Sequence, residues 1–118
     1  MSEDDDRLES ARMLAESGSR AAGAEAFRKL AADSRAGEDV RLEAAVGLAE
    51  MDERSAVEAY RSIATDSSVG EDVRLEAARG LSEVDERSAA EAYRSIAADS
   101  SVGEDVRSEA ARGLAEVS

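Results

Sequence analysis

Residues 37–69 read GEDVRLEAAVGLAEMDERSAVEAYRSIATDSSV, and residues 70–102 repeat them almost unchanged as GEDVRLEAARGLSEVDERSAAEAYRSIAADSSV. A third copy begins at Gly103 with GEDVRSEAARGLAEVS. Because Gly37, Gly70 and Gly103 start successive copies, the period is 33 residues. Periods of this length are typical of helical hairpins that stack and bury their apolar faces against one another. The sequence therefore predicts a helical repeat protein.

Each full copy contains the pattern of two amphipathic helices. Apolar residues recur at steps of three or four across residues 71–84 and again across residues 86–98, as they do on one face of an α-helix. Asp85 stands directly before the second of these segments, and Asp52 stands at the same place one repeat earlier. A carboxylate at that position can cap a helix N-terminus. Each unit is therefore expected to be a helix, a short turn, a second helix and a loop.

The N-terminal part is a diverged copy of the same unit. Residues 7–16 match residues 41–50 at an offset of 34, whereas Phe27 matches Tyr60 at an offset of 33. One extra residue therefore lies in the turn at residues 17–22, where an exposed backbone tolerates insertion. We expect an all-α fold of seven helices, an α-solenoid of antiparallel hairpins that forms one domain over residues 1–118, with repeats near 4–36, 37–69 and 70–102 and a half repeat at 103–118.

The charge and composition exclude several classes of protein. A formal net charge of −13 disfavours direct nucleic-acid binding, which depends on Lys and Arg that replace counterions. The same charge fits a basic protein partner, or serves only solubility. The chain has no apolar run of membrane-spanning length, and its start, MSEDDDR, is acidic where a secretory signal would be basic, so we expect no membrane association and a cytoplasmic location.

The side-chain chemistry argues against an enzyme. The chain contains no His and no Cys, so acid-base or nucleophilic catalysis would fall on carboxylates, tyrosines and Lys29. Adjacent carboxylates such as Glu71 and Asp72, or Glu38 and Asp39, point in different directions on a helix and do not converge on one cation. We therefore predict no catalytic site, no metal site and no cofactor.

Residues 73–107, VRLEAARGLSEVDERSAAEAYRSIAADSSVGEDVR, resemble the HEAT-like repeat family, including the short variety first noticed in phycobilisome lyases. The usual Pro of that family is missing, and the loop from Asp99 to Arg107 is longer than usual. A tetratricopeptide array is the rival, because AAEAYRSIAADSS resembles the second helix of that family. The first helix of a tetratricopeptide unit would need a bulky residue and a Leu-Gly pair, which this sequence lacks in register.

The resemblance to HEAT-like proteins implies two sets of residues. In that family, recurring Asp and Arg residues bond across neighbouring repeats, which implies a structural Asp/Arg ladder that pairs Asp33 with Arg41, Asp66 with Arg74, and Asp99 with Arg107. The helices that carry the VRLEAA motif usually line the concave side and recognise partners. The implied partner-binding residues are Glu43, Val46, Glu50, Glu76, Arg79, Glu83, Glu109, Arg112 and Glu116. Among them, the replacement of Val46 by Arg79 is the largest change in polarity between the two long repeats.

The function expected from the resemblance is a non-catalytic protein-interaction module or scaffold with an acidic concave surface. Two alternatives stay open. One is an acidic inhibitor that mimics nucleic acid and binds a basic protein. The other is a structural spacer or a self-assembling or designed repeat protein, for which a homodimer through residues 104–117 is expected, because Ala110, Ala111, Leu114 and Val117 have no second helix to cover them.

Overall fold

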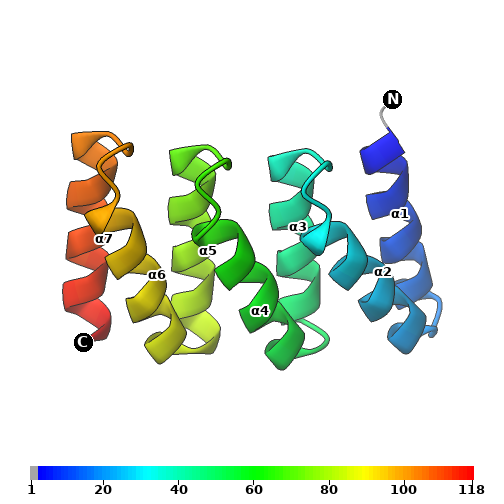
Figure 1. Cartoon of the computed structure of the whole chain (residues 1–118). Helices are drawn as coiled ribbons and strands as arrows, with labels where there is room; N and C mark the ends of the chain where they lie inside the picture. Colours follow the sequence, from blue (N-terminus) through cyan, green and yellow to red (C-terminus); the bar gives the residue numbers. More distant parts are fainter. Residues whose placement is uncertain (1–2) are drawn as a thin grey trace. The chain divides into compact units, whose positions relative to one another are not determined.

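The structure is a computed structural model that describes residues 3–118. In this part of the chain the secondary structure is entirely α-helical, as Figure 1 shows. The seven helices are α1 (Glu3–Glu16), α2 (Arg20–Ala32), α3 (Glu38–Ala49), α4 (Glu53–Ala64), α5 (Glu71–Val84), α6 (Glu86–Ala98) and α7 (Glu104–Val117). The predicted all-α class and the predicted number of helices are confirmed.

The helix termini follow from local sequence. The helices α3, α5 and α7 begin after Gly37, Gly70 and Gly103, and each has two acidic residues in its first turn. Negative charge there is favourable because the helix dipole is positive at its N-terminus. Asp85 caps α6 by accepting a hydrogen bond from the Arg87 backbone N–H, as predicted.

The extra residue of the first repeat lies in the turn between α1 and α2. Gly18 adopts a φ of 96° in this turn, a conformation that residues with a Cβ rarely adopt. The Ser19 backbone N–H donates to the carbonyl of Leu14 and closes the turn. The insertion is therefore accommodated outside the helices, where the sequence comparison placed it.

The chain divides into two compact units, one ending at Ala59 and the other spanning Tyr60–Ser118, with the boundary inside α4. In the first unit, α2 packs against α1 and α3, and α1 also contacts α3. In the second unit, α6 packs against α5 and α7, and α5 also contacts α7. Each unit therefore has the order of adjacent hairpins found in a HEAT-repeat solenoid. A single domain over residues 1–118 stays a prediction.

The core consists of a few large side chains among many alanines. Fully buried large residues come one each from the helices α2 to α6, namely Leu30, Leu48, Ile63, Leu81 and Ile96. Most of the other completely buried side chains are alanines, which bury little apolar area each. The core is therefore thin.

Three aromatic rings pack directly on glycines of the following helix. The ring of Phe27 lies where a Cβ on Gly47 would be 2.8 Å from it, and the rings of Tyr60 and Tyr93 stand in the same way against the glycines at positions 80 and 113. All three rings are at least 95% buried. Tertiary packing thus compensates for the low helix propensity of glycine. These three aromatic residues therefore belong to the core.

The Asp/Arg ladder joins helices in a way that differs from the predicted pairing. Asp33 accepts a hydrogen bond of 2.8 Å from Arg7, and Asp99 accepts one of 2.8 Å from Arg74. The predicted partners were Arg41 for Asp33 and Arg107 for Asp99, so these two assignments are wrong. Asp33 and Asp99 each bond to the Arg in the first helix of their own hairpin.

The pairing of the ladder follows from a second hydrogen bond, which the Nε atom of the guanidinium donates to a backbone carbonyl. Arg74 is 3% exposed and donates from Nε to the carbonyl of Ala64, at the end of the preceding hairpin, over 2.9 Å. Arg41 donates in the same way to the carbonyl of Ala31 over 3.0 Å. Each of these two arginines therefore contacts the preceding repeat through a carbonyl at the C-terminal end of a helix. In Arg74, Nη1 is left to bond the Asp of its own repeat.

The same Asp residues organise the loops that follow the even-numbered helices. Asp99 accepts hydrogen bonds from both the backbone N–H and the hydroxyl of Ser101, at 2.9 and 2.6 Å. Asp66 accepts the equivalent pair from Ser68. Such Asp-centred turns compete with helix continuation and fix the direction of the loop. The bonds from Ser101 and from Arg74 together hold the pKa of Asp99 well below its ordinary value.

We expect the stability of the Asp99→Asn variant to depend less on pH than the stability of the wild type does. Because the pKa of Asp99 is lower in the folded chain than its ordinary value of 3.8, its contribution is complete above that value and is lost as the pH falls below it. At about pH 7 the variant should be less stable than the wild type, and the gap should narrow by about pH 2. Urea unfolding at both pH values measures this, and a gap that stays constant would contradict it.

Candidate protein-binding site

Eight of the nine predicted partner-binding residues lie on the odd-numbered helices α3, α5 and α7, and Glu50 is the C-cap residue of α3. The eight charged members are all exposed, and Val46 is 47% exposed. These residues divide between the two units. Glu43, Val46 and Glu50 belong to the first unit, and the remaining six belong to the second.

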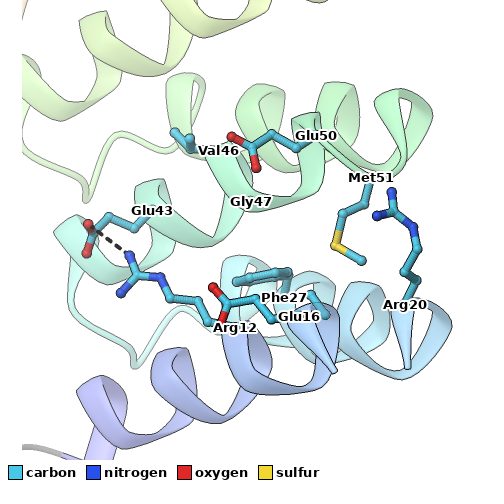
Figure 2. Close-up of a pocket in the computed structure, with 10 residues that line it drawn as sticks. Arg12, Glu16, Arg20, Phe27, Glu43, Val46, Gly47, Glu50 and Met51 are labelled. Carbon is cyan, nitrogen blue, oxygen red and sulfur yellow. Dashed lines mark hydrogen bonds and ion pairs between the residues drawn. The ribbon is translucent and has the colours of Figure 1, made fainter. Parts of the chain in front are cut away.

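In the first unit, these residues line an open pocket of about 490 Å³ between α1 and α3, which we call the α1–α3 pocket. Figure 2 shows Arg12 and Glu43 facing each other at one end of the pocket, and Arg20 beside Met51 at the other. Its volume lies within the range typical of ligand-binding pockets. The lining residues are Arg12, Ala15, Glu16, Arg20, Phe27, Glu43, Val46, Gly47, Glu50 and Met51.

The α1–α3 pocket has an apolar floor and a charged rim. Phe27 is only 4% exposed, and its ring lies on Gly47, so both are fixed by core packing. At the rim, Arg12 on α1 and Glu43 on α3 form an ion pair of 3.4 Å between exposed side chains. This pair contributes little to stability because water screens it. It can therefore open and bond to a partner at low cost.

The second unit has an equivalent pocket of about 300 Å³ between α5 and α7, which we call the α5–α7 pocket. Arg79 on α5 and Glu109 on α7 form an ion pair of 3.1 Å at its rim, matching the pair in the first unit. Arg79 also bonds to Glu76 over 2.9 Å, and this bond raises the pKa of the guanidinium. The lining residues are Arg79, Ser82, Tyr93, Glu109, Arg112, Gly113 and Glu116.

Tyr93 takes the place of Phe27 in the α5–α7 pocket. Its hydroxyl brings a polar group to the floor, and burial raises the pKa of this hydroxyl. Loss of a proton from Tyr93 at neutral pH is therefore disfavoured, so this group can donate a hydrogen bond but is not poised as a base. The pocket therefore offers hydrogen-bonding groups and charged side chains.

The structure brings most of the predicted site residues together, but not all of them. Seven of the nine line one of the two pockets, whereas Glu76 and Glu83 do not. Glu76 instead bonds to Arg79 within α5, and Glu83 is exposed on the same helix. Contact between these residues and a partner stays a prediction.

Sequence reasoning missed the half of the α1–α3 pocket that comes from the first repeat. Arg12, Glu16 and Arg20 line it, and none was predicted as a site residue. A signal was present, because Arg12 aligns with Arg79 once the extra residue of the turn is allowed for. The divergence of the first repeat hides this correspondence.

Glu71, one of the carboxylates that the sequence offers as a cation ligand, has a structural role. Glu71 accepts a hydrogen bond of 2.9 Å from the Gly103 backbone N–H, and Asp4 accepts the equivalent bond of 2.8 Å from Gly37. Each bond links the start of one odd-numbered helix to the start of the next. Residues 3–118 contain no group of three or more acidic side chains placed to hold a metal ion. Over the same residues, no helix is long and apolar enough to span a bilayer.

Comparison with known proteins identifies the repeat. The sequence profile described as HEAT repeats matches residues 31–115. No curated protein and no solved structure matches the chain. HEAT-repeat domains are typically protein-interaction scaffolds and are generally non-catalytic. Because the match covers most of the sequence and the helices follow one another in hairpin order, the chain belongs to the HEAT-repeat family.

Proposed function

We propose that this chain is a non-catalytic protein-interaction module whose partner docks on the exposed residues of the odd-numbered helices. The observation that carries the proposal is the repetition of one pocket design in both units. In each, a buried ring lies on a glycine beneath an exposed Arg–Glu pair that joins two odd-numbered helices. A repeated pocket with adaptable polar groups at its rim suits recognition of an extended protein surface.

The partner we propose has a basic surface. The predicted partner-binding residues comprise six Glu, two Arg and one Val, and the whole chain carries a net charge of −13. Complementary charge steers association and suppresses partners of the wrong sign. We also propose that the chain is of the short variety first noticed in phycobilisome lyases, which residues 73–107 resemble, and that it is located in the cytoplasm.

Particular residues bear on the two alternatives, the nucleic-acid-mimicking inhibitor and the self-assembling protein. A nucleic-acid-mimicking inhibitor needs rows of carboxylates, and Arg79 and Arg112 interrupt such rows in the second unit. A self-assembling protein needs an apolar face. The expectation that Ala110 is uncovered is wrong, because this residue is completely buried, but on α7 Ala111 is exposed and Leu114 and Val117 are half-buried. The second alternative therefore retains support, as a homodimer through α7.

A capture experiment with matched charge reversals tests the proposal. One variant carries Glu43→Lys, Glu76→Lys and Glu109→Lys on the odd-numbered helices. The control carries Glu25→Lys, Glu58→Lys and Glu91→Lys, which are also exposed and lie at the same spacing on the even-numbered helices. Both variants change the net charge equally, so non-specific electrostatic effects are the same in each.

The proposal predicts that partners retained by the wild type are retained by the even-helix variant and lost by the odd-helix variant. Loss of the same partners from both variants would show only a general effect of charge and would contradict the proposal. Competition between DNA and the chain for the captured protein would favour the inhibitor. A mass that rises with concentration and falls for a Leu114→Glu variant would favour the homodimer.

A further inference from the structure

The α1–α3 and α5–α7 pockets are built on the same plan but differ at one rim position. Their matching residues lie two periods apart, with one further residue of offset for α1. Phe27 corresponds to Tyr93, Arg12 to Arg79, Glu43 to Glu109, and Glu50 to Glu116. On the second odd-numbered helix of each pocket, Val46 occupies the position that Arg112 occupies in the other. An apolar side chain thus replaces a cation.

Val46 gives the α1–α3 pocket an exposed apolar patch. Its side chain is 47% exposed, one of the few large apolar residues of the chain that is not covered. Ala15 and Met51 are half-buried and line the same pocket as the ring of Phe27. The α5–α7 pocket has Arg112 where the first has Val46, and Ser82 where the first has Ala15, so it lacks this patch. An aliphatic side chain of a partner would gain apolar contact only in the α1–α3 pocket.

The charges of the α1–α3 pocket specify what should stand beside that aliphatic side chain. Arg12 is engaged with Glu43, whereas within residues 3–118 neither Glu16 nor Glu50 has an ion-pair partner. Both carboxylates line the pocket, and Figure 2 shows Glu50, at the C-terminal end of α3, beside Val46, and Glu16, at the end of α1, near Phe27. They attract a cation placed next to the aliphatic group. In the α5–α7 pocket, Arg112 supplies a positive charge on the same helix as Glu116 and opposes such a cation.

At the other end of the α1–α3 pocket, Arg20 limits the charges that a partner can place there. Arg20 lies beside Met51 there, and its guanidinium has no ion-pair partner among the described residues. A second cation at this end would be repelled. The pocket is therefore complementary to a segment with one basic residue adjacent to one aliphatic residue, rather than to a run of basic residues.

We propose that the α1–α3 pocket binds an aliphatic side chain flanked by a single Lys or Arg in a protein partner, and that Val46 is the residue that determines this specificity. The inference rests on the proposed function, since it names the chemistry that one of the two pockets selects. The α5–α7 pocket does not share the preference, because Arg112 stands in the place of Val46.

Three short synthetic peptides serve as probes for the full chain. They are acetyl-Gly-Lys-Leu-Gly-amide, the same peptide with Ser in place of Leu, and the same peptide with Glu in place of Lys. Methyl NMR signals of Val46 and Met51 report binding at the α1–α3 pocket. We expect the Lys-Leu peptide to shift both signals and to bind about tenfold more tightly than either of the other two.

Substitutions at the two corresponding positions provide the matched controls. Val46→Thr keeps the shape of the side chain and adds no charge, and it should weaken the Lys-Leu peptide about threefold or more. Val46→Arg should weaken the same peptide about tenfold. Arg112→Val should give the α5–α7 pocket a response to the Lys-Leu peptide that the wild type lacks. Both positions are exposed, so the fold should tolerate these changes.

Equal affinity for the three peptides, no shift at Val46 and Met51, or an unchanged response after Val46→Arg would each overturn the inference. So would a pocket occupied by a second copy of the chain, which would appear as a larger mass that Val46→Arg abolishes. These failures are distinct from failure of the proposed function. If the odd-helix charge reversal still releases protein partners, the interaction surface stands and only the specificity of the α1–α3 pocket is wrong.

Discussion

Replacing Phe27 with Ala is expected to lower the free energy of unfolding by about 3–5 kcal/mol. The ring is only 4% exposed, and it fills the space directly above the Cα of Gly47. Removing it loses the transfer free energy of the ring and leaves a cavity that a glycine cannot fill. Since domains of this size are stable by only about 5–15 kcal/mol, the loss is a large fraction of the total. Urea unfolding followed by circular dichroism measures it.

The repeats supply the control for this substitution. Phe27→Tyr introduces the residue found at the equivalent positions of the other repeats, and we expect it to cost less than about 1.5 kcal/mol. Adding Gly47→Ala to Phe27→Ala should recover part of the lost stability, because the new methyl group enters the vacated space. In the wild type, the same methyl group would be 2.8 Å from the ring and should destabilise the chain. A cost below about 1 kcal/mol for Phe27→Ala would contradict the packing described here.

Replacing Arg74 with Met is expected to lower the free energy of unfolding by about 2–4 kcal/mol. Met retains the apolar stem of the side chain but cannot donate to the carbonyl of Ala64 or to Asp99. The side chain of Asp99 is 22% exposed, so water relieves part of the loss on that side. The buried end at Ala64 has no such relief. The effect should therefore exceed that of breaking a surface ion pair.

Arg107→Met is the matched control, because Arg107 occupies the same position in α7. Arg107 is half-buried, and within residues 3–118 its side chain donates no hydrogen bond. We expect this variant to change the free energy of unfolding by less than about 0.5 kcal/mol. Equal effects of the two substitutions would show that Arg74 acts through its apolar stem alone.

The helices could be predicted from the sequence because several local signals coincide in each repeat. The predicted segments Glu71–Val84 and Glu86–Ala98 coincide with α5 and α6. Apolar spacing defined their faces, Asp85 marked the boundary between them, and the glycine of each copy marked the start of the next hairpin. The near-identity of the copies made each signal visible more than once. Such agreement between local and global preferences is what allows a sequence to specify one fold.

The pairing of the Asp/Arg ladder could not be predicted in the same way. Arg74 can reach either an Asp or a helix C-terminal carbonyl, and the sequence does not say which nitrogen of the guanidinium takes which partner. The packing of α4, α5 and α6 decides this, because it places the carbonyl of Ala64 against Nε and Asp99 against Nη1. The spacing indicated that Asp and Arg recur in each repeat, but it did not indicate which Asp bonds to which Arg.

Only part of the candidate site could be predicted from the sequence, because its two walls come from helices far apart in the chain. Repeat-to-repeat comparison identified Val46 as the position of greatest change in polarity, and the structure places it in a pocket. The opposite wall comes from α1, whose sequence has diverged and is shifted by one residue at the turn. Contacts between α1 and α3 join residues about 30 positions apart, which no local pattern reveals.

Site-specific cross-linking tests the central claim most directly. A photoreactive side chain is placed at position 46 on α3 or, as a control, at position 58 on α4; both positions are exposed. Proteins that the wild-type chain captures are then irradiated with each variant. Docking on the odd-numbered helices predicts cross-links from position 46 and few from position 58. Cross-links of equal yield from both positions, or from position 58 alone, would contradict the claim that this surface binds the partner.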